Sequence, residues 1–235
     1  MIDVDTVLPD EFFAALPGPD AILAHSIPVN VDRWHKAIAG RGLPPLQGKL
    51  SGPGHMRISR ADVFDQGDRE PTVENAFQLL YHSLTWGLGT RAPRLHTRLD
   101  ALATDPDRAG ELLVTAWEAA RSGAPAAEAY SALTTHRGAG RIRWFGPAFA
   151  TKFLYFAQGA AAEPRLLILD AVVAGNLPEA WPGAAAGAWY PETYSRYCDL
   201  LTSWAGQATA RLNGSRNVSA DELEYVLFHR KPSHS

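Results

Sequence analysis

The chain has 235 residues, 46% of them hydrophobic, and a formal net charge of −3 at pH 7, which is sufficient for a core in one large domain or two closely packed lobes. Its single cysteine, Cys198, excludes a disulfide framework and a cysteine-ligated metal cluster within one chain. The N-terminus lacks the pattern of a signal peptide, and no apolar run approaches the ~20 residues of a membrane helix, so we expect a cytoplasmic protein with no membrane partner.

Most of the expected helices begin with a proline or an acidic residue in the first turn. The glycine- and proline-rich stretches 17–32 and 40–56 are expected to be loops. The apolar run 165–169 is expected to be a loop that leads into a buried helix, because no partner strands are evident. These elements predict an all-α fold of roughly ten helices. In chain order, the helices are expected to begin near Pro9, Val31, Pro71, Pro93, Asp105, Pro125, Pro147, Asp170, Pro191 and Ser219.

Acidic and basic residues are separated along the chain. The stretches 33–61, 75–99 and 129–162 hold 13 of the 22 basic residues and none of the 25 acidic ones. Such a separation can place the basic residues on one positive face, which would suit a polyanion such as DNA. The alternative is that folding distributes these residues over the whole surface.

The stretch 141–170 places one lysine among aromatic residues and ends an apolar run on one aspartate. Gly146 permits a backbone conformation that other residues avoid, and the proline that follows it suits the first turn of a helix. On that helix, Lys152 falls beside a buried stripe of phenylalanines. The amides of such a turn can bind a phosphate, and the flanking Arg141 and Arg143 can do the same.

Each of these residues also has a structural explanation. A lysine near aromatic rings usually extends to solvent or makes a cation–π contact, and an aspartate after an apolar run is often a helix cap. Together, and at this spacing after a Gly-Pro turn, Lys152 and Asp170 favour a functional role.

The stretch resembles the helix-hairpin-helix DNA glycosylases, and most closely their 8-oxoguanine DNA glycosylase-like branch. The resemblance rests on the hairpin glycine Gly146, on Thr151 near the start of the second helix, on Lys152, and on Asp170 at the start of the next helix. The 18-residue separation of Lys152 and Asp170 is close to that of the bifunctional members. The resemblance covers about 30 residues, and the helices on either side are compatible with it without being diagnostic.

The stretch also departs from the family pattern. The second hairpin glycine is replaced by Ala148, and both Lys152 and Asp170 lie about two residues late when counted from Gly146. A hairpin lengthened by two residues would explain both shifts. Alternatively, Lys152 is only a helix residue and Asp170 acts alone, as in the monofunctional members. The four-cysteine iron–sulfur loop of some relatives is absent.

The resemblance implies a two-lobed helical fold with a helix-hairpin-helix motif at about 130–158. We expect residues 1–70 to form an N-terminal extension packed on a core of residues 71–235. The implied partner is double-stranded DNA that carries a damaged or modified base, and no obligate protein partner is evident. No cofactor or catalytic metal is expected, although the resemblance allows a structural monovalent cation held by hairpin carbonyls.

The implied chemistry assigns roles to individual residues. Apolar surroundings disfavour the ammonium form of a lysine, so Lys152 can attack C1′ of the sugar and form a Schiff base. An ionised Asp170 can stabilise the positive charge that develops on the sugar. The expected DNA contacts come from Arg141, Arg143, Gly146, Ala148 and Thr151, and the expected base pocket is lined by Trp86, Trp144, Phe149, Trp189 and Tyr190.

The leading hypothesis is a DNA glycosylase with abasic-site (AP) lyase activity, for which 8-oxoguanine is the default base. One alternative is a glycosylase that removes a hypermodified base from phage DNA in antiviral defence. Another is a non-catalytic helix-hairpin-helix DNA-binding protein, and a third is a helical protein-interaction domain.

Overall fold

The computed structural model describes residues 6–160, 163–178 and 188–230. The first five residues, which belong to the stretch considered above for a signal peptide, lie outside these ranges. Among the described helices, none is long and apolar enough to cross a membrane.

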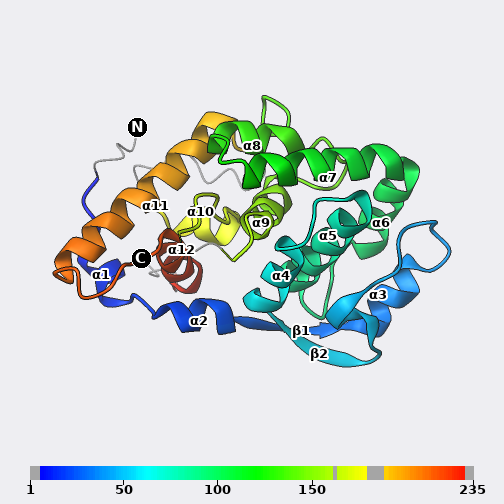
Figure 1. Ribbon diagram of the computed structural model, residues 1–235, viewed down its shortest axis with the longest axis horizontal. Helices are drawn as coiled ribbons and strands as arrows, with labels where there is room; N and C mark the ends of the chain where they lie inside the picture. Colours follow the sequence, from blue (N-terminus) through cyan, green and yellow to red (C-terminus); the bar gives the residue numbers. More distant parts are fainter. Residues whose placement is uncertain (1–5, 161–162, 179–187, 231–235) are drawn as a thin grey trace.

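The described residues form twelve α-helices, one 3-10 helix and two strands (Figure 1). The first half of the chain contains α1 (Asp10–Ala14), α2 (Pro19–Ala24), β1 (Ser26–Asn30), α3 (Val31–Ile38), η1 (Gly48–Ser51), β2 (His55–Ser59), α4 (Arg60–Gly67), α5 (Val73–Leu88), α6 (Leu95–Thr104) and α7 (Pro106–Arg121). The second half contains α8 (Ala126–Leu133), α9 (Pro147–Ala157), α10 (Ala171–Asn176), α11 (Pro191–Arg211) and α12 (Ala220–His229).

Local sequence signals explain most of the helix starts. The side chains of Thr72, Asp105 and Asp170 accept hydrogen bonds from the first-turn amides of α5, α7 and α10. Ser59 and Ser219 each open a capping box, at α4 and α12. The helices predicted from these signals are confirmed. Helix α4 was not predicted, because it follows shortly after the glycine- and proline-rich stretch 40–56.

Two strands correct the all-α prediction. β1 and β2 pair in antiparallel register, with Ile27 opposite Ile58 and Val29 opposite Met56. Together with α2, they occupy parts of the stretches 17–32 and 40–56 that were predicted as loops. Pro28 is tolerated in the middle of β1 because both strands of a two-stranded sheet are edge strands. Val29 and Ile58 are fully buried, and the sheet packs on α5.

Helices α5 and α9 are buried over most of their length. α9 contacts α4, α5, α7 and α8, and it lies near the middle of the molecule (Figure 1). Apolar residues therefore face neighbouring elements on several sides of α9, which is why the phenylalanine stripe is only part of its buried surface. A charged residue on such a helix loses water unless it lies at the edge of the core.

The connection between α8 and α9 is longer than a tight turn. Residues 134–146 join the two helices, and Thr134 and Gly140 form an isolated β-bridge within the connection. Gly146 has φ −74°, and a Cβ at this position would meet nothing. The prediction that Gly146 uses a conformation special to glycine is therefore wrong. The helix-hairpin-helix motif and the division at residue 70 stay predictions.

Candidate active site

Asp170 lies between the extended segment 165–169 and α10. Its Oδ1 accepts hydrogen bonds from the backbone N–H groups of Val172 at 3.0 Å and Val173 at 3.1 Å. Its Oδ2 accepts a hydrogen bond from Nζ of Lys152 at 2.7 Å. Burial alone would raise the pKa of Asp170, but the Lys152 ammonium and the two amides lower it to below its ordinary value. Asp170 is therefore an ionised carboxylate at neutral pH.

Among the described residues, side chains and not a strand hold the segment that precedes Asp170. The Thr151 hydroxyl accepts the N–H of Leu169 at 3.1 Å and donates to the carbonyl of the same residue at 2.9 Å. The Tyr197 hydroxyl donates to the carbonyl of Ile168 at 2.7 Å. These bonds satisfy backbone groups that a strand would pair in a ladder. The prediction of a loop is confirmed, and α9 and α11 together fix the position of Asp170.

Lys152 reaches Asp170 through a space that a glycine leaves open. A Cβ on Gly87 of α5 would lie 2.9 Å from Cδ and 3.2 Å from Cε of Lys152. Gly87 is exposed. The side chains of Lys152 and Asp170 are nearly buried, with 9% and 15% of their surface accessible to solvent. The two charges therefore lie at the edge of the core.

A second ion pair lies deeper than the first. Arg60 of α4 is fully buried and donates to Oε2 of Glu224 at 2.8 Å and to the hydroxyl of Tyr155 at 3.1 Å. Tyr155 in turn donates to Oδ2 of Asp221 at 2.7 Å. Burial raises the pKa of Glu224 to about 7, although the Arg60 guanidinium opposes the rise. Because Tyr155 follows Lys152 by one helical turn, this buried network supports α9 behind the candidate site.

Sequence reasoning missed the buried network. Arg60 belongs to a basic stretch that was predicted to face solvent, and its partner Glu224 lies 164 residues later in the chain. The only local signal is the capping box at Ser59, which predicts a helix but not its buried face. Arg98 and Lys152 are likewise buried. Arg60, Arg98 and Lys152 therefore cannot belong to a positive face on the surface of the protein.

The residues predicted to contact DNA differ in their surroundings. Arg141 is exposed, and its Nε donates to the carbonyls of Ser131 at 2.9 Å and Thr134 at 3.0 Å. Arg143 is exposed, whereas Ala148 is half-buried. Thr151 is fully buried with its hydroxyl engaged by Leu169, which makes it a positioning residue in this structure.

The five aromatic residues predicted to line a base pocket lie in different environments. Trp86 and Trp189 are buried in the core, with 5% and 2% of their surface exposed. Phe149 is half-buried, and the Arg98 guanidinium lies 4.4 Å from its ring centroid. Trp144 and Tyr190 are exposed by 43% and 55%. A pocket that combines all five stays a prediction.

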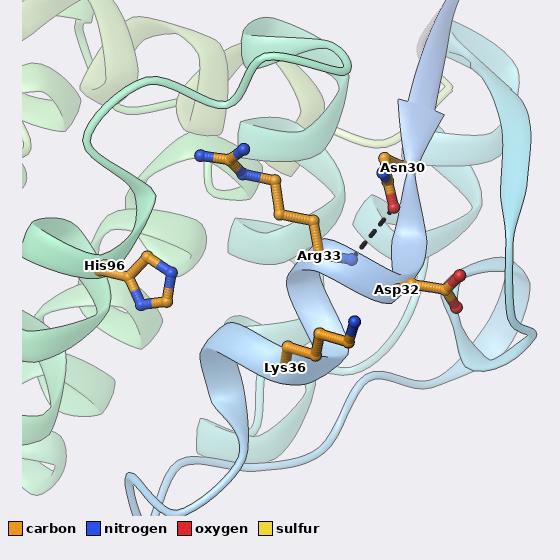
Figure 2. Close-up of a pocket in the computed structure, with 5 residues that line it drawn as sticks. All are labelled: Asn30, Asp32, Arg33, Lys36 and His96. Atoms are coloured by element: carbon orange, nitrogen blue, oxygen red, sulfur yellow. Dashed lines mark hydrogen bonds between the residues drawn. The ribbon is translucent and has the colours of Figure 1, made fainter.

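The three acid-free stretches meet at the first turns of α6. Helix α3 of the first stretch packs against α6 of the second, and an open groove of about 430 Å³ lies between them. Figure 2 shows Arg33 and Lys36 of α3 and His96 of α6 around this groove, while the Asp32 carboxylate points away from Arg33. The third stretch reaches α6 through the contact between Arg94 and Trp144. Folding therefore gathers basic side chains from three distant segments.

Metal ligands do not cluster in the part of the chain that the structure describes. No group of three or more histidine, cysteine, aspartate or glutamate side chains there is arranged to hold a metal ion.

The chain matches the model of one known protein family over most of its length. The model of the family described as "Putative 8-oxoguanine DNA glycosylase OGG-like protein" matches residues 20–228, which include both strands and both members of the Lys152–Asp170 pair. No curated protein and no solved structure matches the chain significantly.

Proposed function

Because the chain belongs to the OGG family of 8-oxoguanine DNA glycosylase-like proteins, we propose that it excises a damaged or modified base from double-stranded DNA. The default base is 8-oxoguanine, and we further propose that the protein cleaves the strand at the resulting abasic site. The observation that supports this proposal is the 2.7 Å contact between Nζ of Lys152 and Oδ2 of Asp170 at the edge of the core.

The two side chains have complementary roles in the proposed reaction. Breakage of the C1′–N bond leaves positive charge on the sugar, and the ionised carboxylate of Asp170 stabilises that charge. The Lys152 ammonium must lose a proton before its nitrogen can attack C1′, and Asp170 already accepts its hydrogen bond. The new N–C1′ bond replaces the bond to the base, and the proton that Lys152 releases passes through Asp170 to the departing base, which leaves Asp170 ionised. Opening of the sugar ring then gives the Schiff base from which the strand is cleaved.

Borohydride trapping tests this proposal directly. The protein is incubated with labelled duplexes that carry 8-oxoguanine, an abasic site, uracil or glucosylated hydroxymethylcytosine, and the reductant is then added. We expect a covalent protein–DNA product with the wild type and none with Lys152→Gln. Lys49→Gln is the control, because Lys49 forms an exposed ion pair with Asp62 and should trap as the wild type does.

The other outcomes identify other functions. Abasic sites that form without a trapped product, and that depend on Asp170, would mean a monofunctional glycosylase in which Lys152 is a bystander. Binding to DNA with neither product on any substrate would contradict catalysis and favour the non-catalytic DNA-binding protein.

Gly87→Ala is expected to reduce strand cleavage without reducing stability. Alanine stabilises a helix by roughly 0.5–1 kcal/mol relative to glycine, yet the new methyl group would contact the Lys152 side chain and displace its amine. The measurements are single-turnover cleavage and thermal unfolding. Gly206→Ala on α11 is the matched control, because a Cβ there meets nothing, so it should leave cleavage unchanged. Equal cleavage by the two variants would contradict the proposed role of the Gly87 space.

A further inference from the structure

Trp144 combines an exposed ring with an unfavourable backbone. Its φ is +68°, a left-handed conformation that costs conformational energy in a large aromatic residue. The residue nevertheless remains 43% exposed, so the fold buries only part of its surface. Strained residues of this kind concentrate at functional sites, and Trp144 lies only three residues before α9, the helix that carries Lys152.

Two arginines flank the ring of Trp144. The guanidinium carbons of Arg94 and Arg143 each lie 5.7 Å from its centroid. Arg94 is the N-cap residue of α6 and has a left-handed backbone as well, with φ +55°. No ion pair between described residues involves either arginine. The indole and its two cations therefore face solvent without acidic partners.

This combination matches the chemistry of a nucleic acid. A nucleobase offers a flat π face that stacks on an indole, and the phosphates on either side of the base attract guanidinium groups. The groove shown in Figure 2 is lined by Asn30, Asp32, Arg33, Lys36 and His96, and His96 places it at the same end of α6 as Arg94. Arg33 and Lys36 therefore add two basic side chains that can attract phosphates near this end of the helix.

We propose that Trp144, held between Arg94 and Arg143, stacks on a nucleobase of the bound DNA outside the pocket that receives the excised base. Arg94 and Arg143 bind the neighbouring phosphates. This assignment moves Trp144 from the lining of the base pocket to the DNA-binding surface. It rests on the proposed function only in taking DNA as the ligand.

Equilibrium binding to a duplex with a tetrahydrofuran abasic analogue tests the proposal, because this probe cannot react. Trp144→Gly removes the ring but suits the left-handed backbone, so it should unfold at the wild-type temperature or above. We expect this variant to bind the probe about 10- to 100-fold more weakly, and Trp144→Phe to retain most of the affinity. Arg94→Ala and Arg143→Ala should each reduce the slope of log affinity against log salt by about one.

Arg196→Ala is the control for the arginine variants, because Arg196 is exposed on α11 and is not one of the two arginines that flank the ring of Trp144. Unchanged affinity of Trp144→Gly would overturn the stacking role, and a large loss of stability would show that Trp144 is structural instead. Both results can occur while the wild type still excises bases, so they are distinct from failure of the proposed function. Salt slopes that do not change in the arginine variants would overturn the phosphate contacts.

Discussion

Asp170→Asn is expected to slow base excision by roughly 10²- to 10⁴-fold and to leave the fold intact. Asparagine caps a helix about as well as aspartate, so its oxygen can still accept the amides of Val172 and Val173. What the variant loses is the negative charge, which faces Lys152 at 2.7 Å and would stabilise the cationic sugar. Single-turnover excision and thermal unfolding, measured on the same preparation, separate the two effects.

Asp105→Asn provides a matched control for that experiment. Asp105 caps α7 by accepting the backbone N–H of Arg108 at 3.2 Å, and no ion pair between described residues includes it. The same chemical change at this cap should leave excision at the wild-type rate. If Asp170→Asn also excised within about tenfold of the wild type, Asp170 could not be the residue that stabilises the sugar.

The helices and the Lys152–Asp170 pair could be predicted because their signals are local. Thr72, Asp105 and Asp170 are N-cap residues whose side chains bond to amides two or three residues later, so each helix start can be read from a short stretch of sequence. Proline indicates several other helix starts. The apolar loop before Asp170 follows α9 after a short interval, so one helix and one loop are sufficient to bring Lys152 and Asp170 together. The spacing of the two residues therefore carried most of the information about the candidate site.

The remaining features depend on partners that are distant in the sequence. β1 has only five residues with Pro28 at its centre, and its pairing with Ile58 and Met56 is visible only once the chain has folded. The burial of Arg60 could not be predicted either, because it depends on the distant residue Glu224. A basic side chain in an acid-free stretch gives no local sign that a carboxylate far along the chain will cover it.

Replacement of Glu224 by leucine is expected to lower the free energy of unfolding by about 3–5 kcal/mol, because it leaves the Arg60 guanidinium buried without its counter-ion. The measurement is urea unfolding at about pH 8, above the raised pKa of Glu224, so that the carboxylate of the wild type is ionised. Glu11→Leu is the control, because its ion pair with Arg230 is exposed and contributes little.

The double variant Arg60→Met with Glu224→Leu should be more stable than Glu224→Leu alone. Methionine removes the unpaired charge and fills much of the same space, while Tyr155 keeps its hydrogen bond to Asp221. Recovery in the double variant would mean that the single variant fails because of an isolated charge, and not because α4 and α12 have lost a strong attraction. A double variant less stable than Glu224→Leu would reverse that conclusion, since the arginine would then stabilise the core through its contacts with Tyr155 and Trp86.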